Sequence, residues 1–276
     1  MLIDVHVHVF PPEVTKNIER YIKKEEFLRA ICTSRGHKYA TAEDVLEEMQ
    51  KSGVDKTIIC GFASSDEGLN REMNDYVLEV TKKYPDRLMA WAVVSPHSSS
   101  MEREIARCHE LGAVGVGELF PWGQKFPLEG KEAGRLAGIC QERQIPLLLH
   151  VNENVGHDYT GKGDISVKEA ADYATRFPEL TIVYAHWGGG LPFFELMPEI
   201  KKSMRNVYYD TAAGPFLYRK DIYRVAREAD ILPKILLGTD YPLITQRRYL
   251  RELRESGLTE EEINMVAGEN AAKLFV

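Results

Sequence analysis

The chain begins with a run of alternating residues, Leu2-Ile3-Asp4-Val5-His6-Val7-His8-Val9-Phe10. Side chains alternate between the two faces of a β-strand, so this run predicts a strand with Asp4, His6 and His8 on one face. The valines then form the opposite face and pack on a core. Two neighbouring imidazoles on one face can bind the same metal ion. The run equally fits an edge strand whose polar face lies in solvent.

Seven more short apolar runs follow and alternate with helical patterns. They cover residues 56–62, 88–94, 114–119, 146–151, 181–186, 206–211 and 234–239. Near-continuous apolar strands indicate a parallel sheet that is buried on both faces. Eight such strands in 276 residues predict a (β/α)₈ TIM barrel, formed as a single domain over residues 1–276. A doubly wound sheet is the alternative, but no GxGxxG motif follows the first strand.

Helix signals support this alternation. Four capping-box patterns are present, at Thr41–Asp44, Ser99–Glu102, Ser166–Glu169 and Thr259–Glu262. Gly53, Gly112 and Gly257 are placed to end helices. Residues 10–40 and 152–165 are unusually long connections after the first and fifth strands. In a barrel they would cover the catalytic end, either as substrate walls or as merely solvated loops.

Composition excludes several kinds of partner. The net charge is −7, which argues against nucleic acid and against anionic membrane surfaces. Four scattered cysteines form no CxxC pair, and no secretory pattern precedes the first strand, so we expect a cytoplasmic protein with reduced thiols. No apolar run is long enough to span a membrane. We therefore expect a small-molecule substrate; the oligomeric state stays open, with a homodimer among the expected states.

Ionisable residues stand where the apolar runs stop. These residues are His6, His8, Glu118, His150, His186 and Asp240. The carboxyl ends of barrel strands meet at one mouth, so the six side chains should converge there. Histidines and carboxylates are ordinary ligands for Zn²⁺, and also for Mn²⁺, Fe²⁺ and Ni²⁺. Taken singly, each residue also has a structural explanation, such as a core histidine, an ion pair or a turn aspartate.

The ordered set of motifs resembles the amidohydrolase superfamily, in particular its amidohydrolase-related branch of predicted metal-dependent TIM-barrel hydrolases. The resemblance lies in residues 4–8, in His150 after three leucines, in residues 185–189, in residues 238–242 and in the closing residues 268–275. It implies that His6, His8 and His150 bind a metal. It implies further that His186 is either a ligand of a second metal or a catalytic group, and that Asp240 is both a ligand and the proton shuttle.

The resemblance leaves the number of metal ions open. The Gly117-Glu118 pair resembles the fourth-strand carboxylate of two-metal TatD-like nucleases, whereas Trp187-Gly188-Gly189-Gly190 resembles mononuclear decarboxylases. We expect Glu118 to be a ligand.

Three functions fit these residues. The first is a hydrolase in which one or two ions, most simply Zn²⁺, activate water to attack a small amide, lactone or ester, with Asp240 and His186 as catalytic groups. The second is a metal-dependent decarboxylase of an unsaturated or aromatic acid, whose carboxylate would be held by Arg35, Arg247 or Arg248. The third is a metal-binding protein without enzymatic activity.

Overall fold

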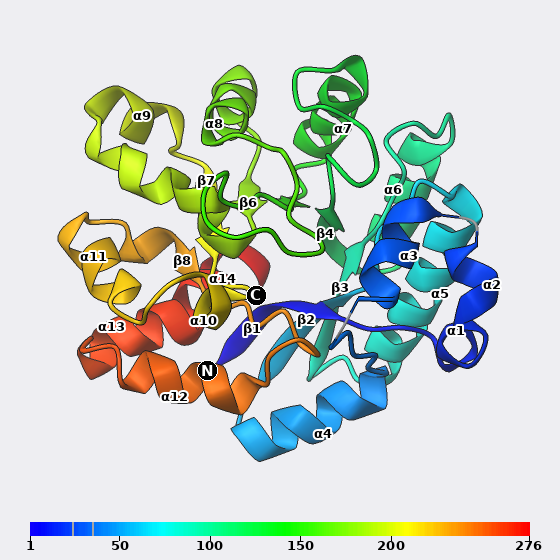
Figure 1. The fold of residues 1–276 in the computed structure, drawn as a ribbon, viewed down its shortest axis with the longest axis horizontal. Coiled ribbons are helices and arrows are strands. Elements are labelled where there is room, and N and C mark those ends of the chain that lie inside the picture. Colours follow the sequence, from blue (N-terminus) through cyan, green and yellow to red (C-terminus); the bar gives the residue numbers. More distant parts are fainter. Residues whose placement is uncertain (24, 35) are drawn as a thin grey trace.

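Eight parallel strands pair in chain order in the computed structural model, which describes residues 1–23, 25–34 and 36–276 (Figure 1). The strands are β1 (Ile3–His8), β2 (Lys56–Cys60), β3 (Leu88–Ala92), β4 (Ala113–Leu119), β5 (Leu147–Leu149), β6 (Ile182–Tyr184), β7 (Val207–Asp210) and β8 (Ile235–Leu236). All eight predicted strands are confirmed. All except β4 are shorter than the apolar runs that predicted them, because those runs continue into the loops at the barrel mouth.

Backbone hydrogen bonds between the first and last strands close the barrel. The Val5 amide donates to the carbonyl of Leu237 at 2.8 Å, and the Asp240 amide donates to the carbonyl of His6 at 2.9 Å. The (β/α)₈ prediction is therefore confirmed, and the doubly wound alternative is wrong. Closure also brings the end of β1 beside the segment that follows β8.

Helices surround the strands, as Figure 1 shows. They are α1 (Pro12–Lys16), α2 (Ile18–Ile22), α3 (Glu26–Cys32), α4 (Ala42–Ser52), α5 (Glu67–Lys83), α6 (Met101–Glu110), α7 (Lys131–Glu142), α8 (Val167–Arg176), α9 (Pro198–Ser203), α10 (Gly214–Leu217), α11 (Ile222–Glu228), α12 (Gln246–Arg254), α13 (Glu260–Asn264) and α14 (Asn270–Phe275). The long connection after β1 contains α1, α2 and α3. Within the described residues, no helix combines the length and the apolar character that a membrane span needs.

Three of the four predicted capping boxes are present, at 41–44, 166–169 and 259–262. The prediction at Ser99 is wrong. Helix α6 begins at Met101 after Ser100, and no side chain caps its first turn. The helix starts one residue later than predicted, and the hydroxyl of Ser100, the residue before it, donates to the carboxylate of Glu67 on α5 and not to the first turn.

Strand β1 is buried on both faces, so the alternative of a solvated polar face is wrong. Its first acidic residue, Asp4, is fully buried. One carboxylate oxygen accepts from the Thr239 amide at 3.0 Å, and the other accepts from the Thr239 hydroxyl at 2.6 Å and from Gln246 at 2.9 Å. Burial raises the pKa of Asp4 to about 6, although these hydrogen bonds act in the opposite direction. Asp4 thus joins β1 to the chain after β8.

Candidate metal centre

The six predicted site residues meet at the C-terminal mouth of the barrel. His6 and His8 lie in the last part of β1, Glu118 lies near the end of β4, and the others follow strands. All six side chains are buried or nearly so, with exposed fractions from 0 % for His6 to 15 % for Asp240. The structure therefore brings together every residue that the sequence placed at this mouth.

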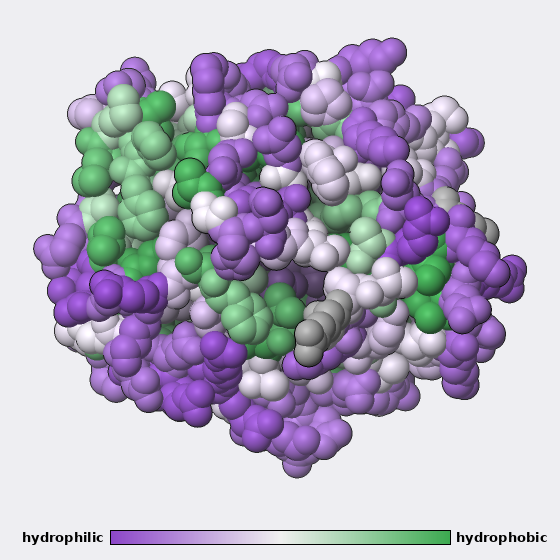
Figure 2. Space-filling model, viewed as in Figure 1, coloured by the Kyte–Doolittle hydropathy of each residue, from purple (hydrophilic) through white to green (hydrophobic). Residues whose placement is uncertain are grey.

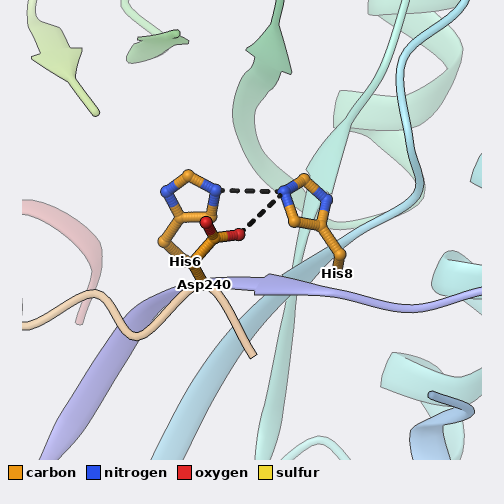
Figure 3. A group of neighbouring side chains, drawn as sticks. All are labelled: His6, His8 and Asp240. Carbon is orange, nitrogen blue, oxygen red and sulfur yellow. Dashed lines mark hydrogen bonds and ion pairs between the residues drawn. The ribbon is translucent and has the colours of Figure 1, made fainter. Parts of the chain in front are cut away.

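His6, His8 and Asp240 form the first donor group (Figure 3). The Nε2 atoms of His6 and His8 are 3.1 Å apart, and the Nε2 atom of His8 is 3.6 Å from Oδ1 of Asp240. Strand β1 supplies both imidazoles because residues two apart share a face. Closure of the barrel brings the carboxylate of Asp240 beside them.

Glu118, His150 and His186 form the second donor group. Nδ1 of His150 lies 3.0 Å from Oε1 of Glu118 and 3.0 Å from Nε2 of His186. Nε2 of His186 is also 3.2 Å from the same carboxylate oxygen. Three successive strands, β4, β5 and β6, therefore direct one side chain each to a common point.

Glu118 connects the two groups. Its second oxygen, Oε2, is 3.3 Å from Nε2 of His6 and 3.2 Å from Nε2 of His8. The side chain is 1 % exposed, so the protein shields these contacts from water. One carboxylate thus faces four imidazoles, with one oxygen toward each donor group.

The spacing of the donor atoms fits a divalent cation. Ligand atoms bonded to a metal at about 2.0–2.2 Å lie roughly 2.8–3.6 Å from their nearest neighbours in tetrahedral or octahedral geometry. The donor contacts within and between the two groups span 3.0–3.6 Å. Histidine and carboxylate donors suit several divalent transition-metal ions, so this donor set does not single out zinc.

Strong local fields act on the titratable groups of the site. Burial alone would raise the pKa of Glu118, but the facing imidazoles of His6 and His150 outweigh it and hold that pKa well below its ordinary value. Burial likewise opposes protonation of His6, yet Glu118 and Asp210 hold its pKa well above the usual range. The pKa of His150 is lowered, by burial and by the neighbouring His186. Glu118 and Asp210 therefore favour positive charge on the His6 side of the site.

Unusual backbone conformations aim three of the side chains. Gly117 has φ +145°, and a Cβ atom there would lie 2.5 Å from Cβ of Leu148, so a glycine must precede Glu118. His186 and Asp240 have φ +56° and +58°, in the left-handed region that non-glycine residues rarely adopt. Such conformations gather at functional sites, where surrounding contacts impose them.

Sequence reasoning missed one buried carboxylate. Oδ2 of Asp210, at the end of β7, lies 2.7 Å from Nδ1 of His6. The signal was available, because Asp210 ends an apolar run just as the six predicted residues do. The corresponding ring nitrogen of His8 faces a different group, the Sγ atom of Cys60 at 3.4 Å.

A cavity of about 550 Å³ opens above the donor groups. Figure 2 shows its mouth near the middle of this face, with hydrophobic residues along part of the rim. Both long connections contribute to its wall, which confirms their predicted position. The wall includes Phe10, Ile31, Lys38, Phe62, Phe120, Tyr159, Phe216 and Leu243.

Polar and aromatic residues near the strand ends divide between this wall and the surrounding packing. Phe120 and His157 line the cavity, but His97, Trp122, Asn152, Trp187 and Tyr241 do not. Trp187 instead packs fully buried, and Asn152 holds its own loop through Gly163. His37 is half-buried and lines the cavity.

The arginines predicted to hold a carboxylate are not in the described wall. Arg247 contacts Glu48 at 3.4 Å, and Arg248 contacts Glu252 at 3.0 Å. Arg35 lies outside the described residues. Lys38 is the one lysine or arginine among the described residues that line the cavity.

Solved structures with the same fold include two decarboxylases. A 5-carboxyvanillate decarboxylase from Sphingomonas paucimobilis is 18 % identical, with a TM-score of 0.77 and coverage of 99 % of this chain and 98 % of that one. A second 5-carboxyvanillate decarboxylase, from Novosphingobium aromaticivorans and in complex with manganese and 4-hydroxy-3-methoxy-5-nitrobenzoic acid, is 17 % identical, with a TM-score of 0.77 and coverage of 100 % and 96 %.

A putative amidohydrolase from Staphylococcus aureus is 20 % identical, with a TM-score of 0.72 and coverage of 99 % of each chain. No protein of curated function matches the chain. The sequence model of the amidohydrolase family matches residues 3–276, nearly the whole chain. The chain therefore belongs to the amidohydrolase family.

Proposed function

We propose that this protein is a divalent-metal-dependent decarboxylase of an aromatic or unsaturated carboxylic acid. The main support for this proposal is an aromatic wall that lies beside the donor groups. The rings of Phe62 and Phe120 are stacked, with centroids 4.8 Å apart, and Phe120 stacks on the imidazole of His150 at 4.7 Å. A flat apolar ring can lie along such a wall while its polar substituents reach the imidazoles.

Charge along the same wall supports an anionic substrate. Lys38 is exposed at the cavity, and no described carboxylate lies within ion-pairing distance of its ammonium group. An acidic group on the substrate would therefore find a cation that is free to pair with it. Two of the structures with this fold are decarboxylases of an aromatic acid, and one of them contains manganese, which supports the same assignment.

The reaction needs a cation, an oriented substrate and a proton. A divalent ion held by the two donor groups would stabilise the negative charge that develops while the carbon–carbon bond breaks and carbon dioxide leaves. The ring or vinyl carbon keeps the bonding electron pair and takes up a proton. Asp240 has the largest exposed fraction of the six site residues, so it is placed to deliver that proton from its carboxyl group.

Hydrolysis is the second candidate, favoured by a different observation. Glu118 presents one oxygen to each donor group, an arrangement that suits two ions acting on one water molecule. In that reaction Asp240 would accept the proton of the attacking water and His186 would polarise the oxygen of an amide, lactone or ester.

The deciding experiment compares products. Protein saturated with Mn²⁺ or Zn²⁺ is incubated with hydroxylated benzoates and unsaturated acids, and separately with amides, lactones and esters. We expect carbon dioxide and the corresponding decarboxylated product, with a loss of about 10²- to 10⁴-fold in kcat for Asp240→Asn, because general acid catalysis contributes that much. Hydrolysis products without carbon dioxide would establish the second candidate and overturn the first.

A further inference from the structure

We infer that Asp210 is a positioning residue that orients one metal-binding histidine in each donor group, His6 in the first and His186 in the second. The inference rests only on the cation-binding part of the proposed function, and not on the reaction catalysed. Asp210 is fully buried at the end of β7, between the strands that carry His186 and Asp240.

The two oxygens of Asp210 act on different donor groups. Oδ2 contacts Nδ1 of His6 at 2.7 Å, in the first group. Oδ1 accepts hydrogen bonds from the backbone amides of His186 at 3.0 Å and Ala212 at 2.9 Å, and thereby holds the second group. The carbonyl of Ala212 in turn lies 3.1 Å from Nδ1 of His186. One carboxylate therefore anchors the ring of one ligand and the strained backbone of another.

The backbone after β8 packs closely against the Asp210–His6 pair. Gly238 on the neighbouring segment lies against it, and a Cβ atom there would come within 3.0 Å of Cβ of His6 and 3.1 Å of Cβ of Asp210. A larger residue at position 238 would therefore displace His6 or Asp210.

The contact with His6 selects which ring nitrogen can bind a cation. A carboxylate only accepts hydrogen bonds, so Nδ1 of His6 must carry the proton. In the neutral imidazole that a cation requires, Nε2, which faces His8 and Glu118, is then the nitrogen with a lone pair. Partners of this kind orient a ligand and increase its basicity.

The substitution Asp210→Asn would reverse this choice. Two backbone amides require an acceptor and cannot turn round, so the single oxygen of the substituted side chain would serve them. Its amino group would then face Nδ1 of His6 as a donor. His6 would have to accept at Nδ1 and carry its proton on Nε2, where the proton blocks the cation.

The test measures metal affinity and the position of the proton. Zn²⁺ and Mn²⁺ affinities of the wild type and Asp210→Asn are obtained by competition with a chromophoric chelator. The protonated ring nitrogen of His6 is identified by long-range ¹H–¹⁵N spectra of the zinc-loaded protein. We expect a proton on Nδ1 in the wild type and an affinity about 10- to 100-fold lower in the variant, the usual cost of losing such a partner.

Tyr209→Phe is the matched control. Tyr209 is the neighbouring residue of β7, is also fully buried, and donates a 2.7 Å hydrogen bond to Glu195 away from the site. Its loss should lower the melting temperature but leave both affinities within about twofold. Circular dichroism establishes that each variant is folded.

Three results would overturn the inference: equal affinities in Asp210→Asn and the wild type, an equal loss in the Tyr209→Phe control, or a wild-type proton on Nε2 of His6. The last result needs no variant, so it decides the matter even if Asp210→Asn does not fold. A wild type that binds both ions but decarboxylates nothing would overturn the proposed reaction and leave this inference standing. A wild type that binds neither ion would overturn both.

Discussion

The substitution Glu118→Gln tests the centre of the site with almost no change in shape. Glutamine keeps one oxygen and replaces the other with an amino group. Because one oxygen of Glu118 faces His6 and His8 while the other faces His150 and His186, one donor group must then face an amino group. An amino group of this kind cannot bind a cation, so that group loses its carboxylate ligand.

The expected loss can be estimated from burial. Glu118 is 1 % exposed, and removing one member of a buried, hydrogen-bonded charge pair costs about 3–5 kcal/mol. We take about 3 kcal/mol, because glutamine still offers one oxygen. Since each 1.4 kcal/mol corresponds to a factor of ten, the affinity for Mn²⁺ or Zn²⁺ should fall by roughly two powers of ten.

Chelator competition gives the affinity, and metal analysis after equilibrium dialysis gives the number of ions per chain. Glu48→Gln is the matched control, because Glu48 is a buried carboxylate on α4 that contacts Arg247 far from the donor groups. The control should bind metal as the wild type does. Unchanged affinity and stoichiometry in Glu118→Gln would refute the assignment of Glu118 as a ligand.

Three further substitutions test other parts of the structure. The pKa of Asp4 is raised from 3.8 to about 6, so the folded metal-free protein holds an extra proton between these values and loses about 3 kcal/mol of stability as the pH rises through them. Relative to the wild type, the free energy of unfolding of Asp4→Asn in urea should therefore rise by up to that amount between pH 4 and 7. A difference that does not depend on pH would contradict the raised pKa. Lys38→Ala should raise KM for the acid about tenfold with little change in kcat, as lost uniform binding does, whereas Lys51→Ala, an exposed lysine on α4, should change neither. Gly268→Ala should destabilise by about 1–3 kcal/mol or more, because its Cβ atom would lie 1.9 Å from the carbonyl oxygen of the first residue, while Gly138→Ala in open space on α7 should stabilise by about 0.5–1 kcal/mol in thermal unfolding.

The barrel and its polar mouth were predictable because both are periodic features. Apolar runs predict the strands, and a parallel barrel places the carboxyl ends of all its strands at one mouth. His150 and Asp240 could therefore be placed near each other without any knowledge of their contacts. The same reasoning gave the alternation that puts His6 and His8 side by side.

Contacts between distant loops were not predictable in this way. Asp210 ends an apolar run as the predicted site residues do, but its contact with His6 spans 204 residues of sequence, and no local pattern identifies that partner. Loop sequences carry no signal for how a connection folds back over a barrel, so the place of His37 in the cavity wall was not predictable. The start of helix α6 was also misplaced, and here too a distant contact is involved. The hydroxyl of Ser100 is bonded to Glu67, which precedes it by 33 residues in the sequence.

The seam between the first and last strands also determines when the site can form. Asp4 and Thr239 are hydrogen-bonded across 235 residues, and His6, His8 and Asp240 complete their group only when that seam has closed. During synthesis the other donors emerge earlier, but a growing chain cannot offer the first group until Asp240 has been made. An ion that needs the complete set of donor atoms binds only the closed barrel. By mass action it then stabilises the closed seam against opening.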